Sequence, residues 1–330
     1  MMVAEDRSRF RLALDRVPFL RARDKIRADA VLDPAAGLSA LSPGQLEAFL
    51  GRVLGARSRP RVASGLGPLP WTPGEWEARA ERDLELFRRT GIGFCAFPDP
   101  DYPPVLRETA RPPFLLYWRG RLPDSEQPLL GMVGTRYPTG RGIAEAERLA
   151  SEAARLGIPV VSGLARGIDA ACHRGALRAG GLGWAVLGCG IDSVYPLQNR
   201  GLAARIVETG GGLLSEYPPG TEALRYHFPE RNRILAGLCR SVLVVEAPRD
   251  SGALITADFA LEEGRDVLVA AVCLESSRSE GCRSLAADGA PAVRDLDGLA
   301  VEWGACPGVR RPALDDSGDF QMQGVLELES

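Results

Sequence analysis

Between residues 129 and 298, short apolar runs alternate with longer segments whose apolar positions recur at helical spacing. The apolar runs predict strands at 129–133, 158–162, 182–188, 211–216, 241–247 and 266–272. The segments between them predict helices at 147–156, 169–180, 199–210, 231–239 and 253–264. Alternation of this kind is typical of parallel βαβ units, and continuous apolar strands indicate a sheet covered on both faces. We therefore predict an extended Rossmann-like α/β core with a doubly wound, mostly parallel sheet.

Outside this core the pattern predicts helices and irregular segments. Apolar positions from Phe10 to about Arg52 predict three or four short helices, and their excess of arginines marks either a nucleic-acid contact or a solvated helix face. The predicted organisation is an N-terminal helical domain (1–54), a Gly/Pro/Ser-rich linker (55–74), a connecting helix with an irregular segment that packs on the core (75–128), the core (129–298) and a largely flexible acidic tail (299–330). The apolar and aromatic residues of FLLYWRG (114–120) predict a strand within the irregular segment.

Composition narrows the range of functions. The net charge of −3 argues against binding nucleic acid through bulk positive charge, so such binding needs a local cluster of cations. The seven cysteines contain no Cys-x-x-Cys pair and there are only two histidines, so we predict no metal, no disulfide framework and no cofactor. The chain has no apolar run of about 20 residues and no signal peptide, which predicts no membrane contact and a cytoplasmic location.

Small and polar residues follow the predicted strands. In an open parallel sheet, ligands bind beyond the carboxyl ends of the strands, where free backbone N–H groups favour anions. There a glycine lets a ligand approach the backbone, and a serine caps a helix or donates to a phosphate. In any single loop such residues are ordinary turn residues, but five loops together predict an anion site. The small and polar residues expected to line this anion site are Gly134, Thr135, Ser162, Gly163, Gly167, Gly188, Ser215, Ser251 and Gly252.

Arginines occur in the same loops. Arg136 and Arg166 follow the first two core strands, while Arg225, Arg231 and Arg233 surround a helix start at Pro229. Cations at several strand ends would supply the local cluster that the net charge lacks, and they suit a phosphate polymer. Next to them, Phe228 and Tyr226 could stack on bases or pack internally.

Asp169 and His173 are four residues apart on one predicted helix, so an acid/base dyad is conceivable. We favour a structural role, in which Asp169 interacts with the helix dipole and His173 orients loop backbone. No nucleophile-elbow, Walker or His-Glu zinc motif supports catalysis, and we predict that the protein is not an enzyme.

Long ordered motifs resemble the DprA/Smf family. They are DPDYPPVLRETARPPFLLYWRG (99–120), VGTR (133–136), VSGLARGIDAACHRGAL (161–177), AVLGCGIDSVYPLQN (185–199), LLSEYPPG (213–220), YHFPERNRILAGLCRSVLVVEAPRDSGALITADFALEEGRDV (226–267) and GCRSLAADGA (281–290). The resemblance implies a protein that binds single-stranded DNA, protects it, interacts with the recombinase RecA and loads it onto incoming DNA during natural transformation. It also implies a homodimer and N-terminal helices of the SAM or helix-hairpin-helix type.

The same resemblance implies roles for individual residues. Arg136 and Arg225 fall on DNA-contacting positions. The other residues expected to line the matching pocket loops are Ser162, Gly163, Arg166, Ser215, Phe228, Arg231, Asn232 and Arg233. The residues expected to hold the motifs together are Asp169, His173, Tyr195, Asn199, Glu216 and Glu246.

Three features depart from the family pattern. Leu197 stands where related sequences often have a lysine, which removes one basic contact. The usual Pro-Gly after the last strand is replaced by VAAVCLES (269–276), and no C-terminal winged helix is predicted.

Two enzymatic alternatives rest on related folds. A nucleotide-hydrolysing phosphoribohydrolase would need a Pro-Gly-Gly loop, but Ser251-Gly252-Ala253 stands at the comparable turn. A dinucleotide oxidoreductase would need G-x-G-x-x-G after the first core strand, where GTRYPT (134–139) stands instead. Both alternatives are less favoured than DNA binding.

Overall fold

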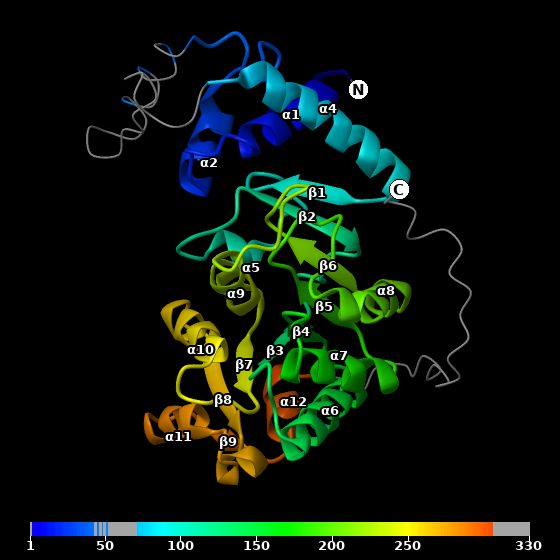
Figure 1. Ribbon diagram of the computed structural model, residues 1–330, viewed down its shortest axis with the longest axis vertical. Helices are drawn as coiled ribbons and strands as arrows, with labels where there is room; N and C mark the ends of the chain where they lie inside the picture. Colours follow the sequence, from blue (N-terminus) through cyan, green and yellow to red (C-terminus); the bar gives the residue numbers. More distant parts are fainter. Residues whose placement is uncertain (1, 43–44, 46–47, 49–50, 52–70, 306–330) are drawn as a thin grey trace.

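A computed structural model describes residues 2–42, 45, 48, 51 and 71–305, and a single sheet runs through it (Figure 1). Its nine strands lie in the order β1-β2-β6-β5-β4-β3-β7-β8-β9. They are β1 (Gly93–Ala96), β2 (Leu115–Gly120), β3 (Leu130–Val133), β4 (Val160–Ser162), β5 (Gly183–Val186), β6 (Gly212–Ser215), β7 (Ser241–Val244), β8 (Asp266–Ala270) and β9 (Ala292–Val293). Neighbouring strands are parallel throughout the part of the sheet that runs β6-β5-β4-β3-β7-β8-β9. The predicted Rossmann-like fold and its six strands are confirmed.

The strand order reverses beside β3. The chain runs from β3 outward through β4, β5 and β6, then returns to place β7 on the other side of β3. In doubly wound sheets, a reversal of this kind opens a crevice at the carboxyl ends of the strands, where ligands bind. The fold therefore directs attention to the loops that follow β3, β4, β5, β6 and β7.

Helices cover both faces of the sheet. They are α5 (Pro104–Arg107), α6 (Gly140–Arg155), α7 (Ile168–Arg178), α8 (Arg200–Glu208), α9 (His227–Leu238), α10 (Gly252–Glu262), α11 (Glu280–Ala287) and α12 (Asp297–Trp303). One hydrophobic cluster packs α6, α7 and α12 on β3, β4, β7 and β8. A second packs α9, α10 and α11 on the opposite face (Figure 1). Two-sided burial explains why the strands consist of continuous apolar runs.

The sheet begins earlier in the chain than predicted. Residues 93–96 form β1 within the segment expected to be irregular, and residues 115–120 form β2, which confirms the strand predicted at the end of that segment. β2 pairs antiparallel with β6, with Tyr117 opposite Ser215, so the predicted boundary at residue 129 falls inside the sheet. Periodicity gave a weak signal for β1, because it has only four residues and prolines follow it closely.

The other end of the core also extends beyond its predicted limit. The acidic tail was predicted to begin at residue 299, but α12 continues to Trp303, whose side chain is buried against the sheet. The rest of that segment, residues 306–330, lies outside the described residues, as do residues 55–70 of the predicted linker.

The N-terminal helices pack against the β1–β2 end of the sheet. They are α1 (Met2–Asp15), α2 (Ala22–Val31) and α4 (Pro73–Thr90). Leu14, Phe87, Tyr117 and Leu213 belong to one continuous hydrophobic cluster, which joins these helices to β2 and β6. The Tyr117 hydroxyl also donates to Asp15 across the boundary at 2.8 Å. The helices therefore share a core with the sheet instead of burying a core of their own.

Candidate nucleic-acid interface

The loops singled out by sequence meet at the carboxyl edge of the sheet. A Cβ on Gly167, in the loop after β4, would lie 2.4 Å from the carbonyl of Thr135 in the loop after β3. A Cβ on Gly188, after β5, would lie 2.9 Å from the ring of Phe228 at the start of α9. Asn232 on α9 donates to the carbonyl of Gly252 at 3.3 Å, which brings in the start of α10. The predicted loops therefore form one continuous edge.

Three of the predicted arginines point outward from this edge. Arg136, Arg166 and Arg225 are exposed. Among the ion pairs of the described residues, none involves these arginines, and Arg166 donates to Gln198 at 2.9 Å. Their charges are therefore not neutralised by a contacting carboxylate. Exposed guanidinium groups that no carboxylate contacts are suited to bind phosphate.

Aromatic rings lie beside Arg136 and next to Arg225 in the chain. The guanidinium of Arg136 lies 5.3 Å from the ring centre of Phe228, whose centroid is 5.5 Å from that of Tyr195. Tyr137 is 71% exposed and Tyr226 is 64% exposed, which is unusual for side chains of this size. Exposed rings interleaved with cations provide stacking surfaces for unpaired bases beside contacts for phosphates.

Two other predicted arginines turn into the protein, contrary to expectation. Arg231 is 3% exposed and donates to the carbonyls of Gly163, at 2.8 Å, and of Val186. Arg233 pairs with Glu216, and both side chains are largely buried. Burial lowers the pKa of Arg231, an effect that the nearby carboxyl of Asp169 opposes. These arginines hold the strand ends together, so their side chains are not available to a phosphate.

The predicted serines also serve the protein itself. The hydroxyl of Ser162 donates to the carbonyl of Met132 at 2.6 Å, which ties β4 to β3. Ser215 donates to the carbonyl of Cys189 at 2.7 Å in the same way. Ser251 accepts a hydrogen bond from the backbone N–H of Ala253 and caps α10. The predicted phosphate contacts of Ser162 and Ser215 therefore do not fit the structure.

Most of the predicted glycines make room for neighbouring parts of the chain. A Cβ on Gly134 would lie 2.6 Å from Ile168, and one on Gly163 would lie 2.6 Å from the guanidinium of Arg231. Gly167 adopts a φ of +82°, which side-chain-bearing residues rarely do. Gly252 differs, because a Cβ there would meet nothing within 4 Å. The expectation that a ligand needs these glycines is therefore wrong for Gly134 and Gly163.

Asp169 and His173 do not form a dyad. Asp169 lies in the first turn of α7 and accepts from the backbone N–H of Ala165 at 3.4 Å, while burial raises the pKa of its carboxyl. His173 is fully buried, and neither ring nitrogen has a hydrogen-bond partner among the described residues. Burial lowers its pKa to about 3. His173 is therefore a neutral core residue, and the expectation that it orients loop backbone is wrong.

Glu246 and Asn199 fix the shape of two loops. Glu246, two residues after β7, accepts from the backbone and hydroxyl of Thr139 at 2.7 and 2.9 Å, and Ser276 also donates to it. Since Thr139 caps α6, this carboxylate anchors the loop that carries Arg136. Asn199 donates to the carbonyl of Leu164 at 2.8 Å, where the backbone takes a φ of +56°.

Sequence reasoning missed several contributors to this edge. Tyr137 was not singled out, although it directly follows Arg136, and Arg278 donates to its carbonyl at 2.8 Å. Arg278 follows the VAAVCLES segment, which forms the end of β8 and the 3-10 helix η2 (Ala271–Glu275). Leu197, at the position where relatives often have lysine, is 67% exposed. An apolar side chain is therefore on the surface where a lysine would place a positive charge.

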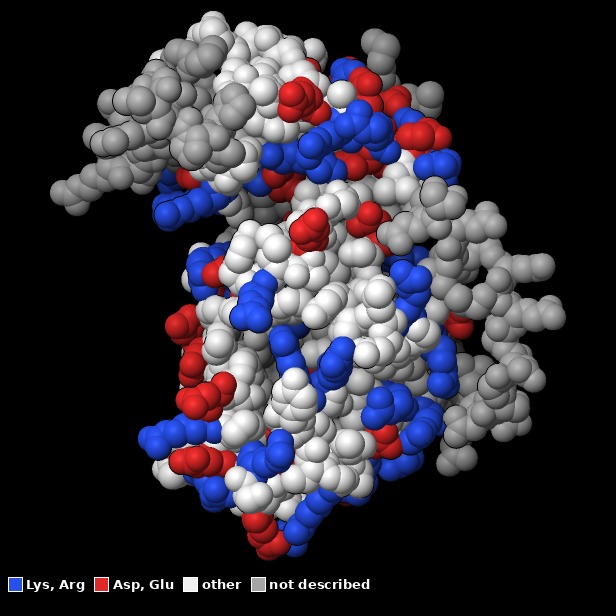
Figure 2. Space-filling view, viewed as in Figure 1, with Lys and Arg blue, Asp and Glu red and all other residues white. Residues whose placement is uncertain are grey.

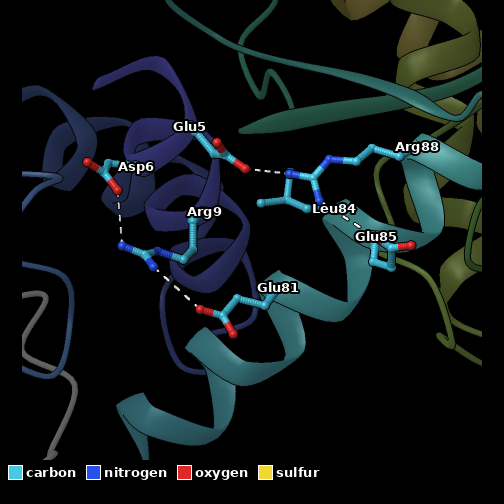
Figure 3. A pocket seen from close by; sticks show the side chains of 7 residues that line it. All are labelled: Glu5, Asp6, Arg9, Glu81, Leu84, Glu85 and Arg88. Carbon is cyan, nitrogen blue, oxygen red and sulfur yellow. Dashed lines mark hydrogen bonds and ion pairs between the residues drawn. The ribbon is translucent and has the colours of Figure 1, made fainter. Parts of the chain in front are cut away.

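A hollow between α1 and α4 offers a contrasting charge pattern (Figure 3). It has a volume of about 440 Å³ and is lined by Glu5, Asp6, Arg9, Glu81, Leu84, Glu85 and Arg88. Arg9 pairs with Asp6 and Glu81 at 3.1 and 3.4 Å, and Arg88 pairs with Glu5 and Glu85. Both arginines are thus neutralised, which makes this hollow unsuited to an anionic polymer.

The face of the molecule shown in Figure 2 carries both basic and acidic side chains over its sheet-containing part. The six cysteines among the described residues are buried and free. Searches of the described residues found no cluster of three or more His, Cys, Asp or Glu able to hold a metal, and no helix long and apolar enough to cross a membrane.

Solved structures resemble this fold. DNA processing protein A from Streptococcus pneumoniae superposes with a TM-score of 0.67 and 31% identity, covering 91% of this chain and 98% of that one. DNA processing protein A from Helicobacter pylori, described for its single-stranded DNA binding mode, gives a TM-score of 0.57 and 25% identity, covering 64% and 94%.

Sequence comparison gives the family. Protein Smf of Synechocystis sp. is 44% identical over 228 residues, which are 68% of this chain and 57% of the relative. DNA processing protein DprA of Streptococcus pneumoniae is 42% identical over 205 residues, 62% of this chain and 72% of the relative. The chain thus spans little more than half the length of the Synechocystis relative. Because residues 93–304, well over half of the chain, match its family model, the chain belongs to the DNA recombination-mediator protein A family.

Proposed function

We propose that this chain binds single-stranded DNA along the carboxyl edge of its sheet, protects it, and delivers it to RecA during natural transformation. The observation that carries the proposal is the group of exposed arginines without contacting carboxylates, Arg136, Arg166 and Arg225, interleaved with Tyr137, Tyr195, Tyr226 and Phe228. The single-stranded DNA binding mode described for the Helicobacter pylori relative supports it. Action as a homodimer is part of the same proposal.

The binding would be electrostatic and stacking in character. Guanidinium groups neutralise phosphates and release counterions, while bases stack on the exposed rings. Stacking tolerates every base and needs unpaired ones, so we expect preference for single strands with little sequence preference. The mechanism needs no catalytic step, which agrees with the separation of Asp169 and His173 into internal roles.

A salt titration tests the phosphate contacts. We expect the affinity for a single-stranded oligonucleotide to fall as salt rises, and the slope of log K against log salt to decrease by about 1.4 in the Arg136→Ala/Arg225→Ala variant, since each lost phosphate contact on a single strand contributes about 0.7. The matched control is Arg121→Ala/Arg155→Ala, which removes two exposed arginines at the opposite edge, one after β2 and one in the last turn of α6. Neither of them is in an ion pair among the described residues. Equal slopes for both double variants would refute the proposal.

A gel shift with and without RecA tests the finer function. We expect single-stranded DNA to bind more tightly than a duplex of equal length, and RecA to assemble faster on the bound strand. Release of bases or phosphate from the DNA by the purified protein would instead indicate a nucleotide-hydrolysing enzyme.

A further inference from the structure

Arg16 links the N-terminal helices to a loop of the candidate interface. It follows α1, its side chain is 11% exposed, and its Nη2 lies 2.6 Å from a carboxylate oxygen of Asp83 on α4. The same nitrogen donates to the backbone carbonyl of Pro219 at 3.2 Å. Pro219 belongs to the loop between β6 and α9, residues 216–226, which we call the 216–226 loop.

The 216–226 loop is held from two sides at its middle. On one side is Arg16, and on the other Asp192, whose carboxylate accepts from the backbone N–H of Gly220 at 3.0 Å. The carbonyl of Thr221 also accepts from the N–H of Gly190 at 2.8 Å. Beyond these anchors the loop runs to Arg225 and Tyr226, which are exposed.

A buried ion pair alone does not account for this arginine. Replacing a buried pair by apolar residues of similar volume is often neutral for stability, because desolvation offsets the attraction. Burial accordingly raises the pKa of Asp83, and the charge of Arg16 opposes that shift. The bond to Pro219 is what an apolar side chain could not supply, because only a donor can satisfy the loop carbonyl while remaining tied to α4.

We propose that Arg16 is a positioning residue for DNA binding, which fixes the 216–226 loop so that Arg225 and Tyr226 are presented to the strand. The N-terminal helices then serve the interface without touching DNA. This inference rests on the proposed function, because it needs Arg225 to contact a phosphate.

The test is a double-mutant cycle in the full chain. Single-stranded DNA affinity is measured over a range of salt for the parent, Arg16→Met, Arg225→Ala and the double variant. Because Arg16 acts through Arg225, Arg16→Met should lower the slope of log K against log salt by up to about 0.7, the contribution of one phosphate. The double variant should have the same salt slope as Arg225→Ala, which is the signature of coupled positions, whereas its affinity can fall further because Tyr226 is also displaced.

Arg11→Met is the matched control. Arg11, on α1, is also a buried arginine, with a side chain 8% exposed. It pairs with Asp29 and Asp99 at 2.9 and 2.6 Å, away from the 216–226 loop. We expect Arg11→Met to leave the salt slope unchanged. The inference would be overturned if Arg11→Met and Arg16→Met gave equal salt slopes. It would also be overturned if Arg16→Met and Arg225→Ala lowered the slope additively in the double variant.

Two further outcomes keep the inference separate from the proposed function and from folding. If Arg225→Ala alone leaves the affinity and slope unchanged, the proposed phosphate contact fails, whatever Arg16 does. If Arg16→Met does not fold, Arg16→Lys takes its place in the same cycle. A single ammonium retains the charge beside Asp83 but cannot reproduce the two-sided contact of the guanidinium, so a smaller loss of slope in the same direction is expected, and no loss counts against the inference.

Discussion

Arginines at the same strand ends face opposite ways. Arg136, Arg166 and Arg225 are exposed and have no contacting carboxylate, whereas Arg231 and Arg233 are buried against backbone carbonyls and Glu216. We call these the outward set and the inward set. The comparison shows that an arginine near the strand ends is available to DNA only if no buried carbonyl or carboxylate binds its guanidinium group.

The partners explain which way each arginine turns. Arg231 and Arg233 lie on α9, which packs against the sheet, and Asp169 and Glu216 place carboxylates within their reach. The outward set lies in loops, and the polar side chain that contacts one of its members, Arg166, is the neutral Gln198. We therefore expect changes in the inward set to alter stability and changes in the outward set to alter DNA binding.

The largest effect is expected at Arg231. Arg231→Met removes the donor to Gly163 and Val186 and leaves the carboxyl of Asp169 buried without its opposing charge. Leaving a buried carbonyl without its hydrogen-bond donor costs about 1–3 kcal/mol, so the loss of the donor to two carbonyls should lower the free energy of unfolding by about 2–6 kcal/mol. Chemical denaturation followed by circular dichroism measures it.

The control for Arg231 comes from the outward set. Arg136→Met should change the free energy of unfolding by no more than about 0.5 kcal/mol, as exposed substitutions usually do. If both variants lost stability equally, the division into inward and outward sets would be wrong.

An intermediate effect is expected at Phe228, which supports the outward set. Its ring lies under the guanidinium of Arg136 and beside Tyr195, so Phe228→Leu removes a stacking surface while keeping an apolar side chain beside Gly188. Stacking of one base on a ring is worth about 1–3 kcal/mol, which predicts an affinity loss of about 5- to 150-fold for single-stranded DNA. Fluorescence anisotropy with a labelled oligonucleotide measures the loss.

Phe259 provides a matched control. It lies on α10 under Arg111, with the guanidinium 5.2 Å from the ring centre, so the same kind of contact exists away from the strand ends. Phe259→Leu should leave the affinity unchanged. A similar loss in both variants would show that the ring contact stabilises the fold and does not serve DNA.

The sequence predicted the fold and the location of the candidate site, but not the direction of its side chains. Apolar runs and strand-end glycines are local signals, and they identified six strands and the loops that meet at one edge. Whether Arg231 faces inward depends on the carbonyls of Gly163 and Val186, which lie far away in the chain and become neighbours only in the folded sheet. The contact of Arg16 with Pro219 spans 203 positions for the same reason, and no periodicity reveals it.

The smallest effect concerns His173, an inward-facing group that Arg231 influences. Burial, with a smaller contribution from the charge of Arg231, lowers the pKa of His173 to about 3, below its value of about 6.5 in an unfolded chain. A histidine with a depressed folded pKa favours folding fully above the unfolded pKa, and this contribution is lost as pH falls toward the folded pKa. Between pH 7.5 and 5.5 it should cost about 1.4 kcal/mol of unfolding free energy.

His173→Leu isolates that contribution from the other titrating groups. The pKa of His227 is also lowered, so the parent loses stability at low pH from both histidines, and only the difference between parent and variant reports on His173. We expect the unfolding free energies of the two proteins to converge or cross by about 1.4 kcal/mol as pH falls from 7.5 to 5.5. Parallel pH profiles would mean that the pKa of His173 is not lowered in the folded protein, and that a neighbouring group stabilises its protonated form.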